Sequence, residues 1–119
     1  MQDLSKRARG QWGERRAAAH LRTLGFNIID RNWRPPEREL QGDLDLVARR
    51  GDLIVFCEVK ARRHDGFGGA AAAVGRQKRV QVRRLAESWL RARTPGEVDV
   101  RFDVIAIEGV TVRHHTAAF

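Results

Sequence analysis

Two segments near the middle of the chain, residues 42–47 and 55–60, alternate apolar and polar residues with the period of a β-strand. The pair Gly51-Asp52 lies between them and suits the two-residue loop of a β-hairpin. If Arg50 pairs with Leu53 across this loop, the register of the two antiparallel strands is fixed. The pattern therefore predicts a β-hairpin whose paired residues can be counted outward from the turn.

This register separates the side chains of the hairpin into an acidic face and an apolar face. Asp45 lies opposite Glu58 and Asp43 lies opposite Lys60, because side chains two positions apart share a face of a strand. The other face carries the apolar residues Leu44, Leu46, Ala48, Val55, Cys57 and Val59. A loop one residue longer or shorter would mix the two faces, so the pattern itself supports this register.

The rest of the chain predicts helices and strands around this hairpin. The expected elements are a helix at about 5–24, a strand at 26–33, hairpin strands at about 40–49 and 53–61, a helix at about 70–93, and strands at 100–108 and 110–115. In the second helix, one helical stripe contains Val74, Lys78, Val82, Leu85 and Trp89. The order α-β-β-β-α-β-β predicts an α/β fold with a mixed central sheet flanked by helices. We expect one domain over residues 1–119, in which residues from about 110 onward form a short edge strand and a C-terminal tail.

The charge of the chain narrows the class of partner. Among 119 residues, 23 are Lys or Arg and 15 are Asp or Glu, which gives a formal net charge of +8 and a sequence pI near 11.3. A small chain this basic points to phosphate-bearing polyanions. No stretch has the length of a transmembrane span, the charged N-terminus lacks the apolar region of a signal peptide, and a single cysteine excludes an internal disulfide framework. We therefore expect a cytoplasmic protein that binds nucleic acid and no membrane.

The acidic face of the hairpin allows two interpretations. Like charges opposite each other destabilise a sheet, and a close pair of carboxylates is relieved by a proton or a cation. Carboxylate oxygens suit Mg²⁺ or Mn²⁺, and Lys60 beside them could orient a water or stabilise charge on a phosphorus centre. The other interpretation is a cross-strand salt-bridge ladder on a solvated face. From the pattern alone, both interpretations stay open.

A family resemblance favours the metal site. Glu14 in the first helix, Asp45 in the second strand and Glu58-Val59-Lys60 in the third follow the order seen in restriction-endonuclease-like nucleases of the PD-(D/E)xK type. More narrowly, the chain resembles the YraN-like family of small bacterial proteins, which is similar to archaeal Holliday-junction resolvases. The matching stretches are 13–14, 31–34, 42–48, 56–62, 67–70, Lys78 and 101–104. The resemblance implies an α-β-β-β-α-β core and a Mg²⁺ or Mn²⁺ site from Glu14, Asp45 and Glu58, with these three and Lys60 as the catalytic residues. Asp43 stands where the family usually has Glu.

Basic residues around these acids are candidates for nucleic-acid contacts. The candidates are Arg34, Arg62, Arg76, Lys78, Arg79 and Arg83. Such residues position phosphates without reading sequence, although a basic run is more often a solvated helix face. Trp33 is a weaker candidate for stacking on bases, whereas Trp89 lies on the helical stripe and is expected in the core.

These observations predict an endonuclease-like protein that uses a divalent metal to hydrolyse DNA phosphodiester bonds, with branched DNA as a candidate substrate. The alternative is a non-catalytic, structure-specific DNA- or RNA-binding protein with a vestigial nuclease site. Symmetrical cutting of a junction would require a two-fold homodimer, so that assembly is a further expectation.

Overall fold

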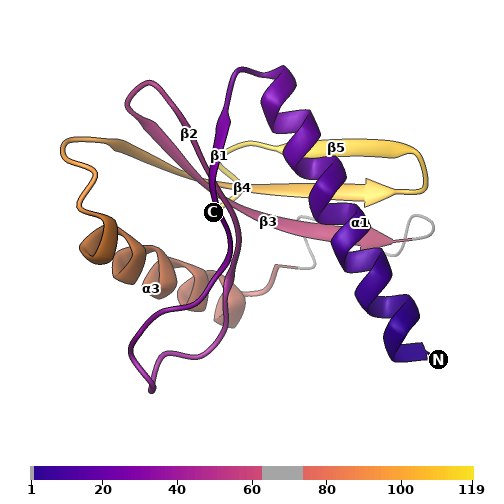
Figure 1. Cartoon of the computed structure of the whole chain (residues 1–119), viewed down its shortest axis with the longest axis horizontal. Helices are drawn as coiled ribbons and strands as arrows, with labels where there is room; N and C mark the ends of the chain where they lie inside the picture. The colour runs from indigo at the N-terminus through magenta and orange to yellow at the C-terminus, as the bar shows by residue number, and fades with distance from the viewer. Residues whose placement is uncertain (1, 63–73) are drawn as a thin grey trace.

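The described part of the chain forms a five-stranded sheet with a helix on each face (Figure 1). The computed structural model describes residues 2–62 and 74–119, in the order α1 (Gln2–Thr23), β1 (Asn27–Trp33), β2 (Leu44–Arg50), β3 (Leu53–Arg62), α3 (Arg76–Arg93), β4 (Asp99–Glu108) and β5 (Thr111–His115). The strands lie in the order β1-β2-β3-β4-β5, and only the β3–β4 pair is parallel. The predicted α/β class with a mixed sheet is confirmed, and it is compatible with a restriction-endonuclease-like core. Neither α1 nor α3 is apolar enough over a sufficient length to cross a membrane.

Helix α1 covers one face of the sheet. Its residues Ala17, Ala18 and Leu21 are fully buried. They belong to one apolar cluster with alternate residues of the hairpin strands, Leu46, Ala48, Val55 and Cys57. Burial raises the pKa of the Cys57 thiol, so this cysteine serves as a packing residue, as the sequence predicts. The apolar face of the predicted hairpin is therefore the face against α1.

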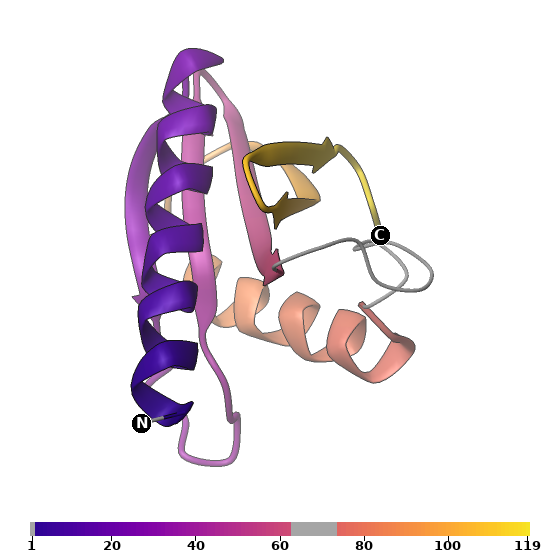
Figure 2. The same ribbon diagram turned by 90° about the vertical axis from the view of Figure 1, so that its right-hand side faces the viewer.

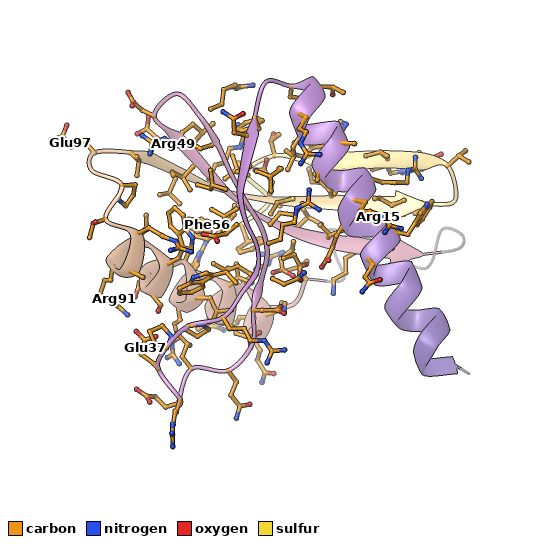
Figure 3. All side chains as sticks on the ribbon, viewed as in Figure 1. Arg15, Glu37, Arg49, Phe56, Arg91 and Glu97 are labelled. Atoms are coloured by element: carbon orange, nitrogen blue, oxygen red, sulfur yellow. The ribbon has the colours of Figure 1, made fainter. Side chains whose placement is uncertain are left out.

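Helix α3 covers the opposite face (Figure 2). Phe56 lies in the interior between the sheet and this helix (Figure 3), where its ring meets the edge of Trp89 at a centroid distance of 5.5 Å. The same cluster includes Val47, Ile54, Val82 and Leu85. Leu44 also packs here, whereas the strand alternation predicts it on the face against α1. It is the first residue of β2, where the chain has only just entered the sheet.

A buried polar contact fixes the end of α3 against β1. The register of β1 shifts between Ile28 and Asp30. Asp30 accepts a hydrogen bond of 2.7 Å from the indole nitrogen of Trp89 and two of 3.0 Å from the guanidinium of Arg93. The indole of a buried tryptophan needs such a partner. Asp30, at the shift in β1, thus anchors α3, the helix that carries most of the basic residues predicted to contact nucleic acid.

A second polar network joins α1 to the C-terminal strands. The buried carboxylate of Asp103 accepts two hydrogen bonds of 2.8 Å from Arg101 and lies 2.7 Å from the ring of His114. The other ring nitrogen of His114 lies 3.1 Å from His20 on α1. These hydrogen bonds hold the Asp103 carboxylate in its ionised form, because they lower its pKa against the effect of burial.

Two predicted boundaries differ from the structure. β2 begins at Leu44 rather than near residue 40, because Gly42 has a φ of +104° that ends extended pairing. A Cβ at Gly42 would also lie 2.5 Å from the amide nitrogen of Gln81, which donates to the Gln41 carbonyl and ties this loop to α3. The second helix begins at Arg76, after the extended Gly75, and the predicted helical residues 70–73 lie outside the described part of the chain.

Candidate functional site

The hairpin register brings Asp45 and Glu58 together as the sequence predicts. The strand pairs run from Arg50 opposite Leu53 to Leu46 opposite Cys57, so the next position places Asp45 opposite Glu58. At this point the carboxylate of Asp45 accepts a 2.9 Å hydrogen bond from the backbone N–H of Val59. The side chain is therefore fixed by the backbone of the strand that carries its acidic partner.

The enclosure of Glu58, with Asp45 half-buried beside it, excludes a freely solvated salt-bridge ladder. Glu58 is only 2% exposed, and one of its carboxyl oxygens, Oε1, is buried without a hydrogen-bond partner among the described residues. Burial raises the pKa of Glu58 to about 8, and the charge of Asp45 adds to the rise. Burial also raises the pKa of Asp45, which shares a hydrogen bond with Glu58. Both shifts favour a protonated acid in this pair over two ionised carboxylates.

Two lysines lie near the pair and differ in their effect. The Nζ atom of Lys78 on α3 lies 3.8 Å from Oε2 of Glu58. The positive charges of Lys78 and Lys60 both oppose the rise in the pKa of Glu58, and that of Lys60 has the smaller effect. Lys60 is half-buried on β3, two residues beyond Glu58. The predicted strand pair of Asp43 with Lys60 is wrong, because Asp43 precedes β2 and follows the turned backbone at Gly42.

Glu14 approaches Asp45 from α1, since the charge of Asp45 contributes to the rise in its pKa. The absent side chain of Gly13 makes this approach possible, since a Cβ there would lie 2.8 Å from that of Ala61. Glu14 is half-buried, and burial raises its pKa, with smaller contributions from the charges of Asp45 and Asp43. It lines a hollow of about 490 Å³, together with Gly10, Gln11, Asn32, Arg34 and Asp43.

Asn32 supports Glu14 and is not a candidate from the sequence. Its side-chain amide donates a 3.3 Å hydrogen bond to the carboxylate of Glu14. Its backbone has a φ of +47°, in the left-handed region that Asn tolerates better than most residues. Strained backbone of this kind gathers at functional sites. The signals in the sequence are an Asn within an otherwise strand-like segment and its place in the stretch 31–34 that matches the family.

The candidate metal ligands are close but not gathered into one cluster. Across residues 2–62 and 74–119, no group of three His, Cys, Asp or Glu side chains is placed to hold a metal ion. Asp45 and Glu58 nevertheless offer hard oxygen donors, one of them unpartnered, and Mg²⁺ commonly takes one or two protein carboxylates plus waters. The pair therefore fits a divalent cation, with Glu14 at the adjoining hollow.

The predicted nucleic-acid contacts lie just after β1, at the end of β3 and along α3. Arg34 lines both the hollow beside Glu14 and a neighbouring one of about 400 Å³ formed by residues 34–42. Arg83 lies over the rings of Phe102 and Phe119, at 5.8 Å from each, and Arg79 lies over Phe119 at 5.9 Å. Arg76 is exposed at the start of α3, while the side chain of Arg62 lies outside the described part.

Trp89 and Trp33 are both packing residues in this structure. Trp89 is 1% exposed, so its predicted place in the core is confirmed. Trp33, the weaker candidate for base stacking, is partly buried against the same apolar cluster.

Comparison with known proteins confirms the family resemblance. The model of the uncharacterised protein family UPF0102, the YraN family, matches residues 13–107. A UPF0102 protein of Frankia casuarinae is 43% identical over 97% of this chain and 98% of its own length. One of Acidothermus cellulolyticus is 41% identical over 97% of this chain and 96% of the relative, and one of Rhodococcus opacus is 47% identical over 84% and 81%. The matched region contains each of the candidate acids and lysines.

Proposed function

The chain belongs to the uncharacterised protein family UPF0102, and from this premise and the site geometry we propose that it is a divalent-metal-dependent endonuclease acting on DNA. The observation that carries the proposal is the enclosed carboxyl group of Glu58, which has one oxygen without a partner among the described residues and lies beside the half-buried Asp45. Placing two acids side by side in a partly enclosed site costs a fold stability, whereas a divalent cation bound there would relieve their repulsion.

Each residue of the site has a proposed role. Asp45 and Glu58 hold the cation, and Glu14 supports its hydration shell from the adjoining hollow. A bound Mg²⁺ or Mn²⁺ would polarise the phosphate and lower the pKa of the attacking water. Lys60 stabilises the charge that develops on the phosphate oxygens, because it lies on the strand of Glu58, two positions away.

Basic residues around the site would hold the nucleic acid. Arg34 lies at the hollow beside Glu14, and Arg76, Arg79 and Arg83 lie along α3. Contacts of this kind bind the phosphate backbone irrespective of sequence. The proposed substrate is branched DNA, and the proposed location is the cytoplasm. A homodimer would present two such sites for the paired cuts at a junction.

A non-catalytic nucleic-acid-binding role is the second candidate. Glu14 stands apart from the acidic pair, and the pKa of Glu58, about 8, keeps that residue largely protonated at neutral pH. A vestigial site would retain this protonated pair without recruiting a cation.

A cleavage assay separates the two candidates. The substrates are a four-way junction, a flap and a linear duplex, each with Mg²⁺, Mn²⁺ or a chelator. We expect metal-dependent cutting by the wild type, and Lys60→Ala should slow it about 100-fold or more through loss of charge stabilisation. Glu97→Gln, which neutralises an exposed acid before β4, is the control and should cut normally. Binding without cutting of any substrate would favour the non-catalytic candidate.

A further inference from the structure

Lys78 forms a loose ion pair with the buried acidic pair. Its Nζ atom is 3.8 Å from Oε2 of Glu58, which is beyond hydrogen-bond distance. Glu58 is almost fully enclosed, with 3% of its side chain exposed, whereas 36% of the Lys78 side chain is exposed. The lysine therefore contributes charge to the site without satisfying the unpartnered oxygen of Glu58. The contact is electrostatic, and the exposed part of the Lys78 side chain can move into solvent.

The position of Lys78 on α3 explains how a lysine comes to face the acids. It lies four residues before Val82 and seven before Leu85, both of which are buried against the sheet. A helix places such residues on one face. Lys78 thus lies on the side of the helix that faces the sheet, and not on its solvated side.

We propose that Lys78 is an exchangeable counter-ion, which neutralises the Asp45–Glu58 pair in the metal-free protein and is released to a DNA phosphate when a divalent cation binds. The inference rests on the proposed metal site. A cation on these carboxylates would lie within a few ångströms of the ammonium group and repel it. The flexible stem of a lysine lets the released charge reach a neighbouring phosphate.

This exchange predicts effects of opposite sign on two ligands. Replacing Lys78 with Met removes a charge that competes with the metal, so Mn²⁺ should bind more tightly, by roughly tenfold. Without the ammonium group, a proton also binds Glu58 more readily and competes with the metal. Mn²⁺ carries twice the charge of a proton, so the loss of the ammonium group still favours metal binding. DNA should bind less tightly to Lys78→Met, and this loss should be larger when a divalent cation has freed the lysine in the wild type.

The test measures Mn²⁺ affinity by calorimetry and affinity for a labelled DNA duplex, the latter with Ca²⁺ or with a chelator. Wild type is compared with Lys78→Met, with Lys78→Arg, which keeps the charge, and with Arg84→Gln, which removes an exposed charge from the same helix. We expect tighter Mn²⁺ binding in Lys78→Met alone, and a loss of DNA affinity in that variant that is several-fold larger with Ca²⁺ than with chelator.

The outcomes distinguish this inference from the metal site on which it rests. If wild type binds Mn²⁺ and Lys78→Met binds it equally or less tightly, Lys78 is a structural partner of Glu58 and the exchange is wrong. An equal loss of DNA affinity with Ca²⁺ and with chelator would also overturn the exchange. If wild type binds no Mn²⁺ at all, the proposed metal site is wrong, and the exchange is overturned with it.

Discussion

At the scale of single residues, the site depends on a conflict between two buried acids. Asp45 is fixed by the backbone N–H of Val59, so it cannot turn away from Glu58. Glu58 is enclosed on the face that packs against α3. A proton, a nearby lysine or a divalent cation can each relieve the repulsion. The stability of the protein should therefore depend on which of these three relieves the repulsion.

The raised pKa of Glu58 predicts a pH dependence of stability. Its folded pKa of about 8 exceeds the ordinary value of 4.5, so the folded state binds more protons than the unfolded state between these two values. The free energy of unfolding should fall as pH rises through this window, by on the order of a few kcal/mol. In Glu58→Gln the amide replaces the protonated acid, and most of the fall should disappear. Urea unfolding at about pH 6 and about pH 8.5 measures the difference between the two proteins.

His20 complicates only the acid side of this measurement. Burial lowers its pKa below the ordinary 6.5, so it removes stability as pH falls below that value. Its effect is shared by wild type and Glu58→Gln and cancels in their difference. Glu97→Gln is the matched control. If Glu58→Gln and wild type lose stability in parallel as pH rises, Glu58 does not hold the extra proton.

At the scale of elements, α3 joins the core to the surface that would meet DNA. Val82, Leu85 and Trp89 pack against the sheet, and Asp30 holds the end of the helix. Arginines occupy other positions of the helix, and two of them, Arg79 and Arg83, lie over aromatic rings. If the protein binds DNA as proposed, a rigid helix with these charges would provide a fixed row of phosphate contacts.

The arginines of α3 should determine how DNA affinity depends on salt. Replacing Arg79 and Arg83 with Ala removes two phosphate contacts, so the slope of log K against log salt should become shallower by up to about 1.8. A double variant of Arg15 and Arg22, exposed residues of α1, removes the same charge elsewhere and should keep the wild-type slope. Fluorescence anisotropy over a salt series measures the slopes. Identical slopes for all three proteins would argue against α3 as the DNA-binding element.

The sequence predicts the helices and strands of this fold better than it predicts the contacts between them. The hairpin register follows from strict alternation beside Gly51-Asp52, and it places Asp45 next to Glu58 correctly. The early start of β2 is mispredicted because the polarity of the preceding loop imitates a strand, while the turn depends on the backbone at Gly42. The distance of Glu14 from the pair depends on the contact of Gly13 with Ala61, which no local pattern reveals.

At the scale of the whole molecule, the site takes residues from the hairpin and from both helices. The hairpin carries α1 on one face and α3 on the other (Figure 2). Glu14 comes from the first helix and Lys78 from the second, so both helices contribute to one group of charges around Asp45 and Glu58. A ligand of this group should therefore stabilise the protein as a unit, since it bridges elements that separate on unfolding.

Thermal melting with increasing Mn²⁺ tests most directly whether Asp45 and Glu58 form a metal site. Wild type should gain about 2.7 kcal/mol of stability at a Mn²⁺ concentration about 100 times the Kd, and its melting temperature should rise accordingly. Asp45→Asn and Glu58→Gln should lose that dependence, while Glu97→Gln keeps it. Without metal, and at a pH above the pKa of Glu58 where both acids are ionised, both site variants should melt at or above the wild-type temperature, because each removes a like-charge repulsion. A Mn²⁺-independent wild type, or site variants destabilised by several kcal/mol without metal, would identify the acids as structural partners and contradict the account.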